Sequence, residues 1–125
     1  MESVYLSDAG PRVSPAIYGF YRWHEVGRNP ADIMERILDV CLELGINTFD
    51  HADIYGDYQC EELFGQVMKQ RSIPRERLVL FSKCGLRLPH SSVPGVRVPH
   101  VDTSSAHIRE SVDNSLRRLR TDYID

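Results

Sequence analysis

Apolar residues along this chain form two kinds of run, and the two kinds alternate. Apolar positions three or four residues apart are typical of amphipathic helices, whereas short continuous apolar runs are typical of buried strands. The spaced runs predict three helices, over Pro30–Leu44, Tyr58–Arg71 and Ser104–Leu119. The continuous runs predict strands over Ile46–Asp50 and Leu78–Lys83.

The order of these elements predicts the fold class. Asp122–Asp125 has the pattern of another strand's opening, so strands and helices alternate along most of the sequence. Such alternation is typical of an α/β fold in which right-handed crossovers join parallel strands. We therefore expect a parallel sheet with helices packed against it.

Local signals mark the ends of the first helix. Asn29 is a residue type suited to the N-cap, and Pro30 fits the first helical position, where its missing N–H costs nothing. Gly45 is placed to end the helix. The stripes that we expect to be buried are Ile33, Ile37, Val40, Cys41 and Leu44 in the first helix, Cys60, Leu63, Phe64, Val67 and Met68 in the second, and Ile108, Val112, Leu116 and Leu119 in the third.

One long segment has no apolar period. Gly85–Thr103 contains three prolines and follows the predicted strand Leu78–Lys83. A loop of this length in a compact domain is usually functional or mobile, and here it leaves the edge of the sheet where α/β proteins bind ligands. A tolerated surface insertion explains the segment equally well.

Composition narrows the class of protein. The chain has 125 residues, with 15 Lys and Arg against 18 Asp and Glu, so its net charge of −3 argues against a basic nucleic-acid binder. No apolar run approaches the roughly 18 residues of a membrane span, and the acidic start predicts no secretory signal. The cysteines are three and widely spaced, which favours a reduced, cytoplasmic protein over a disulfide framework.

Histidines raise the question of a metal, because the sequence has five of them. None lies in a HExxH or CxxC context, and structural zinc needs ligands at short, paired intervals. We therefore expect no metal site. The five are His24, His51, His90, His100 and His107.

Two predicted strands end in residues of opposite charge. Alternation along Ile46–Asp50 turns Thr48 and Asp50 to one face, so Asp50 ends the strand as an inward carboxylate that needs a cation. Lys83 ends the next strand, and adjacent parallel strands lie about 4.8 Å apart, so the two groups can meet. Tyr55 follows Asp50 closely enough to reach the same place.

These three side chains together permit proton transfer. A phenol gives up its proton poorly at neutral pH, but a nearby ammonium favours the phenolate and a carboxylate holds the ammonium in place. Tyr55 would then protonate a carbonyl oxygen, with Lys83 and Asp50 supporting it. Spacing alone leaves open a buried Asp50–Lys83 ion pair with a packing tyrosine.

Longer motifs resemble a known family. The run DHADIYGDYQCE at Asp50–Glu61, with Phe81–Gly85 and Asn114–Asp125, is similar to the N-terminal part of the aldo-keto reductase family. The closest similarity is to its bacterial and fungal oxidoreductases. The resemblance implies a (β/α)8 TIM barrel, of which residues 1–125 are the N-terminal part of a single domain. They hold the first three βα units and the start of strand four, since a whole barrel usually takes about 250 residues.

The resemblance also implies an activity. The family reduces aldehydes and ketones with NADPH, and Asp50, Tyr55 and Lys83 match three of its four catalytic residues. The fourth is a histidine near the end of strand four, where this sequence stops, so we expect the chain alone to lack activity. The loop after the first strand borders the cofactor in this family, which makes Gly19 and Phe20, with Asp50, candidate cofactor-binding residues.

A second hypothesis comes from another class of protein. The chain would then be a non-catalytic truncated product, or an interaction module on a barrel-derived scaffold. Exposed strand edges would let such a fragment associate with itself. In both hypotheses we expect structural roles for His51 and Asp53, and Trp23 either packs or borders the site. Cys84 is either an inert buried thiol or one with a pKa lowered by the lysine beside it.

Overall fold

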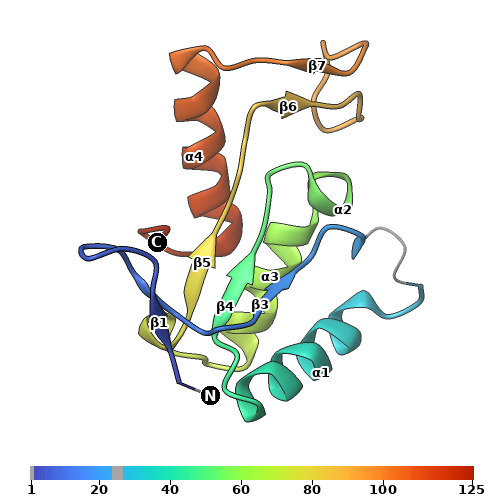
Figure 1. Cartoon of the computed structure of the whole chain (residues 1–125). Coiled ribbons are helices and arrows are strands. Elements are labelled where there is room, and N and C mark those ends of the chain that lie inside the picture. The colour runs from blue at the N-terminus through green and yellow to red at the C-terminus, as the bar shows by residue number, and fades with distance from the viewer. Residues whose placement is uncertain (1, 24–26) are drawn as a thin grey trace.

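The structure is a computed structural model that describes residues 2–23 and 27–125. Three parallel strands, each followed by a helix, form its centre (Figure 1). Strand β3 (Ile17–Gly19) precedes helix α1 (Pro30–Glu43). Strand β4 (Thr48–Asp50) precedes α2 (Tyr55–Tyr58) and α3 (Cys60–Gln70). A short 3-10 turn (Arg75–Arg77), strand β5 (Val79–Phe81) and helix α4 (Ser105–Leu119) complete the third unit.

The sheet has the order β3-β4-β5, with all strands parallel. Its ladder runs past the strand ends, because the N–H of His51 donates to the carbonyl of Phe81 and that of Asp53 donates to the carbonyl of Lys83. Both predicted strands are present and are shorter than the apolar runs that predict them. The α/β class and the three βα units are confirmed.

The helices form one layer against the sheet, with α3 between α1 and α4 (Figure 1). Phe49 of β4 is fully buried on the helix side, as strand alternation predicts, and packs on Phe20 and Phe64. Four of the five residues of the predicted stripe of α3 are buried and Leu63 is partly buried, while Glu61 and Gly65 are buried without having been predicted. Apolar burial between the two layers therefore stabilises the three units as one body.

The two ends of α1 differ in how well the sequence predicts them. Pro30 opens the helix as expected, and Gly45 follows its end at φ +76°, a conformation that glycine adopts without strain. Asn29 occupies the N-cap position as predicted, but its backbone is left-handed and its side chain makes no capping hydrogen bond. The buried residues of α1 are Met34, Leu38 and Cys41, whereas Val40 and Leu44 are about half exposed.

The predicted stripe of α4 is right for Leu119, which is 1% exposed, and wrong for Ile108 and Val112. Helix α4 itself begins where expected, with the Ser104 hydroxyl at the N-cap accepting a hydrogen bond from the N–H of His107. Ile108 and Val112 are 41% and 43% exposed, and the helix instead buries the small and polar face that holds Ser111 and Ser115. The reason is its neighbour α3, which presents the backbone of a glycine and a buried carboxylate rather than an apolar ridge.

The segment 85–103 is more ordered than a plain loop. Strands β6 (Leu86–Arg87) and β7 (His100–Val101) pair as an antiparallel hairpin that extends beyond the N-terminal end of α4 (Figure 1). A second hairpin, β1 (Val4–Tyr5) with β2 (Arg12–Val13), precedes the sheet. At the other terminus, the N–H of Asp125 donates to the carbonyl of Leu80, so this segment lies alongside β5 without forming a strand.

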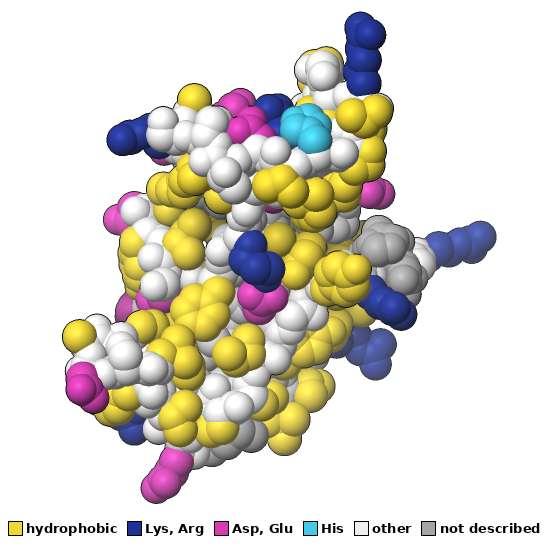
Figure 2. Space-filling model, turned by 45° about the horizontal axis from the view of Figure 1, so that its top comes forward, with side chains coloured by type: hydrophobic (Ala, Val, Ile, Leu, Met, Phe, Trp, Pro, Cys, Tyr) yellow, Lys and Arg dark blue, Asp and Glu magenta, His cyan; other side chains and the backbone are white. Residues whose placement is uncertain are grey.

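The other edge of the sheet is open. Within the described residues no strand pairs with the outer edge of β3, and the sheet does not close into a barrel. Beside this edge lies an apolar hollow of about 420 Å³, and exposed hydrophobic side chains cover much of the face in Figure 2. No helix in the described part of the chain has the length and apolar character needed to cross a bilayer. The hollow is lined by Tyr18, Ile33, Arg36, Ile37, Val40, Cys41, Leu44 and Ile46.

Candidate active site

An ion pair joins the carboxyl ends of β4 and β5. The Nζ of Lys83 lies 2.6 Å from Oδ1 and 2.7 Å from Oδ2 of Asp50, and it also donates to the carbonyl of His51 at 2.7 Å. Both side chains are partly exposed, at 49% for Lys83 and 33% for Asp50. The predicted meeting of these two residues is therefore present, and the pair remains open to a small molecule.

Tyr55 lies at the same end of the sheet, in the turn that forms α2. Its N–H donates to the carbonyl of Ala52, and Gly56 then reverses the chain at φ +57°. A Cβ on Gly56 would lie 3.2 Å from the Cβ of Cys60, so both the left-handed conformation and the close approach favour glycine. The Nζ of Lys83 lies 4.9 Å from the centre of the Tyr55 ring.

The charge on Lys83 is stabilised by its neighbours. Partial burial opposes the charged form, but hydrogen bonding and charge interactions with Asp50 and Tyr55 outweigh it, so the pKa of Lys83 lies above its usual value. Lys83 is therefore an ammonium at neutral pH.

The two residues predicted to contact a cofactor lie differently. Gly19 is exposed, and a side chain there would lie 3.7 Å from Oδ2 of Asp50, so its absence leaves space beside the ion pair. Phe20 is 1% exposed, and its ring stacks on His51 at 4.7 Å between centres. The Phe20 ring is thus part of the core. Only the backbone of Phe20 faces the end of β4, where its N–H donates to the carbonyl of Asp50.

His51 is fully buried between the aromatic rings of Phe20 and Phe64. Within the described residues neither ring nitrogen has a hydrogen-bond partner. Burial, with a smaller effect of the Lys83 charge, lowers the pKa of His51 to about 3. The ring is therefore neutral at physiological pH and acts as a packing group, in agreement with a structural role.

This burial predicts a pH dependence of stability. The unfolded state binds a proton at His51 below about pH 6.5, whereas the folded state does so only near pH 3, so stability falls as the pH drops below about 6.5. Between pH 7.5 and pH 5 the loss from this group is about 2 kcal/mol. Urea unfolding of wild type and of His51→Phe at both pH values gives the free energy of unfolding for each. The change between pH 7.5 and pH 5 should be about 2 kcal/mol larger in wild type than in His51→Phe. Equal changes in the two proteins would contradict the assignment.

Neither expectation for Cys84, a buried thiol or a thiol with a lowered pKa, is met. The residue is exposed rather than buried, and it lines a hollow of about 210 Å³ together with Tyr55 and Lys83. Partial burial of the sulfur and the nearby charge of Asp53 raise the pKa of Cys84. The thiol therefore stays protonated despite the lysine beside it.

Two further residues complete the surroundings of the site. Trp23 is 7% exposed and packs edge-to-face on Phe20, so it belongs to the core. Tyr21 is 66% exposed and meets the Tyr55 ring at 5.6 Å between centres, a neighbour that the sequence pattern does not single out. In the described residues no group of three or more His, Cys, Asp and Glu could hold a metal ion, and His24 lies outside those residues.

Fold and site together define a class of protein. It is an α/β protein built from the parallel βα units of a barrel, with a lysine, a carboxylate and a tyrosine gathered at the carboxyl ends of its strands. The chain belongs to the aldo/keto reductase family, whose model matches residues 16–125. The expected family resemblance is thereby confirmed, and several of the relatives are named as oxidoreductases or reductases.

Individual relatives support this assignment. An uncharacterised oxidoreductase of Bacillus subtilis is 44% identical over 112 residues, which cover 90% of this chain and 37% of the relative. A 6-dehydroglucose reductase of Agrobacterium fabrum is 36% identical and matches 100% of this chain and 42% of its own length. The holo form of an aldo-keto reductase from Bacillus halodurans superposes with a TM-score of 0.79 at 36% identity, over 100% of this chain and 38% of its own. The chain thus spans about 40% of the length of these relatives.

Proposed function

We propose that this chain carries the proton-transfer residues of an NADP(H)-dependent oxidoreductase that reduces an aldehyde or ketone to an alcohol. The observation that carries the proposal is the position of Lys83, which binds both carboxylate oxygens of Asp50 and lies over the ring of Tyr55. These three side chains meet where barrel enzymes place their active sites, at the carboxyl ends of the strands.

Each residue has a defined part in the proposed reaction. The hydroxyl of Tyr55 donates its proton to the carbonyl oxygen of the substrate, which prevents a full alkoxide charge from forming there. Lys83 stabilises the phenolate that remains, and Asp50 holds the lysine in place at 2.6 Å. NADPH, when bound, would supply the hydride for the carbonyl carbon.

The residues present fit such a cofactor. Gly19 places no side chain of its own beside Asp50, where a Cβ would lie 3.7 Å from Oδ2, so a cofactor ring would meet no side chain of residue 19 there. The backbone of Phe20 continues this edge, while its ring contributes only to the core. The choice of NADP over NAD, and a cytoplasmic location consistent with three free cysteines, are part of the proposal.

A hybrid barrel tests the activity. Because the chain spans about 40% of its relatives, we expect residues 1–125 alone to give no turnover. In the hybrid they replace the matching 42% of the Agrobacterium fabrum 6-dehydroglucose reductase. NADPH oxidation by the hybrid with 6-dehydroglucose, and with a panel of aldehydes, is expected. A folded hybrid without turnover would contradict the proposal.

Lys83→Met in the hybrid is expected to lower kcat roughly 10²-fold, because the charge that stabilises the developing phenolate is lost. Lys69→Met removes the charge of an exposed lysine on α3 and serves as the matched control. Steady-state NADPH oxidation measures both. Equal kcat values for the two variants would remove Lys83 from the mechanism.

The open edge of β3 favours a second function, self-association. The apolar hollow beside this edge exposes large side chains, among them Val40 at 53% and Leu44 at 58%. An unpaired strand edge next to an apolar surface favours association with a second chain. Sedimentation of the 125-residue chain distinguishes a monomer from a dimer or a larger assembly.

A further inference from the structure

Glu61, near the start of α3, is the most deeply buried carboxylate in the described chain, at 1% exposure. Its Oε1 accepts the hydroxyl of Ser82 at 2.6 Å, and its Oε2 accepts the hydroxyl of Ser115 at 3.0 Å. Arg118 of α4 supplies the balancing charge, with Nη1 3.4 Å from Oε2. The carboxylate thus has partners on α4 and on Ser82, which lies between the end of β5 and Lys83.

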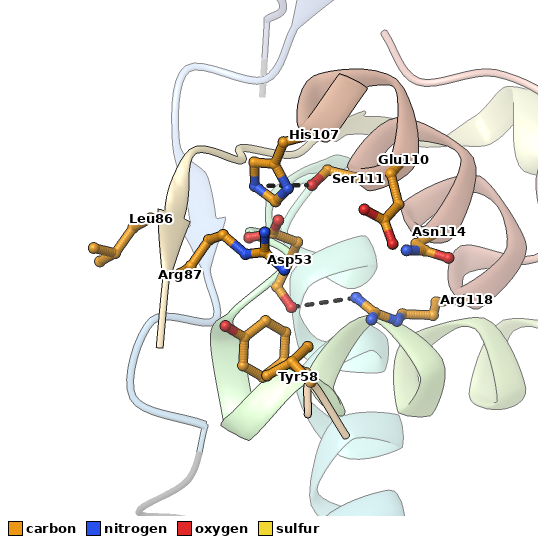
Figure 3. Close-up of a pocket in the computed structure, with 10 residues that line it drawn as sticks. Asp53, Tyr58, Leu86, Arg87, His107, Glu110, Ser111, Asn114 and Arg118 are labelled. Atoms are coloured by element: carbon orange, nitrogen blue, oxygen red, sulfur yellow. Dashed lines mark hydrogen bonds between the residues drawn. The ribbon is translucent and has the colours of Figure 1, made fainter. Parts of the chain in front are cut away.

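Arg118 continues this network to the other active-site segment. Its Nη1 also donates to the carbonyl of Asp53 at 3.3 Å, from the α4 side of the hollow shown in Figure 3. The N–H of Asp53 in turn donates to the carbonyl of Lys83 at 3.0 Å. A continuous path of hydrogen bonds therefore joins Glu61 to two backbone segments beside the Asp50–Lys83 ion pair. One segment contains Asp53, close to Tyr55, and the other contains Lys83.

Stability alone does not explain a charge in this place. Taking a carboxylate and a guanidinium out of water is unfavourable, and packed apolar side chains often hold two helices as well or better. Directed hydrogen bonds differ from apolar packing because they fix the distance and orientation of the groups they join. Ser82 is the residue before Lys83, so a bond to its hydroxyl restrains the lysine's own backbone.

We propose that Glu61 is a positioning residue, which holds the segments of Lys83 and Tyr55 at a fixed separation through Ser82 and Arg118. The inference rests on the proposed function, in which these two side chains act together. Small displacements matter in such a pair, because a shift of about 1 Å in a reacting group can lower a rate about 10²-fold. Glu61 itself lies behind the strands and touches no substrate.

The chain offers a direct measurement of this separation. It contains two lysines, Lys69 and Lys83, so ¹³C-labelled lysine gives two sets of side-chain NMR signals. Lys83 lies over the Tyr55 ring, whose ring current shifts its methylene protons, whereas Lys69 is exposed on α3. Tyr55→Leu shows how far the Lys83 signal moves when the ring is absent. The position of this signal in the 125-residue chain therefore reports the Lys83–Tyr55 geometry.

Glu61→Gln is expected to move the Lys83 signal toward its position in Tyr55→Leu and to leave the Lys69 signal in place. Glu62→Gln is the matched control, since Glu62 is the adjacent carboxylate and binds Gln66 and Arg120 on the surface. If Glu61→Gln does not fold, Ser82→Ala, which removes a single hydroxyl of the network, gives the same readout.

Two results would overturn the inference: a folded Glu61→Gln with an unmoved Lys83 signal, or equal movement in Glu62→Gln. A loss of thermal stability without movement of the signal would assign Glu61 a purely structural role. The measurement needs no turnover, so its failure is distinguishable from failure of the proposed function, which the hybrid barrel tests separately.

Discussion

Tyr55→Phe is expected to lower kcat for carbonyl reduction about 10²–10⁴-fold in the hybrid barrel, the range of a lost general acid. The substitution removes one hydroxyl and keeps the ring, so the contact of Lys83 with the ring centre at 4.9 Å is retained. Because the loss falls on the proton-transfer step, cofactor binding should change little. Steady-state rates and fluorescence titration with NADPH measure the two quantities separately.

The control for this prediction is Tyr5→Phe. Tyr5 is 68% exposed and lies in the hairpin that precedes the sheet, so the same hydroxyl is removed away from the site. We expect unchanged kcat in this variant. If Tyr55→Phe retained a rate within about threefold of wild type, another group would have to donate the proton.

Gly65→Ala is expected to destabilise the 125-residue chain by about 3 kcal/mol, the upper end of the usual effect of overpacking. A methyl group at Gly65 would overlap the carbonyl oxygen of Arg118 and lie 2.9 Å from the carbonyl carbon of Leu119. These are backbone atoms at the end of α4, so no side-chain rotation relieves the overlap, and α3 and α4 must move apart. Urea unfolding monitored by circular dichroism measures the free energy of unfolding.

Gly27→Ala provides the comparison for this variant. No atom of residues 2–23 and 27–125 lies within 4 Å of a Cβ at Gly27, so the added methyl group meets no described neighbour. The free energy of unfolding should stay within about 0.5 kcal/mol of wild type. A similarly small effect at Gly65 would mean that the two helices do not approach as closely in solution.

The sequence predicts the positions of Asp50, Lys83 and Tyr55 well because strand alternation is a local property. Asp50 and Lys83 each end an apolar run, and two parallel strands can bring such residues together in only one way, at their carboxyl ends. The position of Tyr55 follows from the glycine after it, which permits the left-handed turn. Each of these inferences needs only a few neighbouring residues.

The packing behind these residues, between α3 and α4 and around Phe20, depends on contacts between residues far apart in the sequence. The face that α4 buries is decided by Glu61 and Gly65, about fifty residues earlier in the chain, so the apolar period misplaces Ile108 and Val112. The burial of Phe20 against His51 has the same origin, since it depends on how a loop folds over the next strand. Which face of a helix or loop is buried here is therefore decided by pairs of residues far apart in the sequence, and a local pattern does not reveal such pairs.

The open edge of β3 has a consequence for synthesis on the ribosome. Each of the three βα units is in contact mainly with the unit before or after it, so they can fold before the rest of a longer chain is made. In relatives that are more than twice as long, the strand that closes the barrel beside β3 is made last. At about 5–20 residues per second, the edge then waits roughly 10–40 s uncovered. A chaperone that shields apolar strand edges during this interval would therefore raise the yield of folded protein.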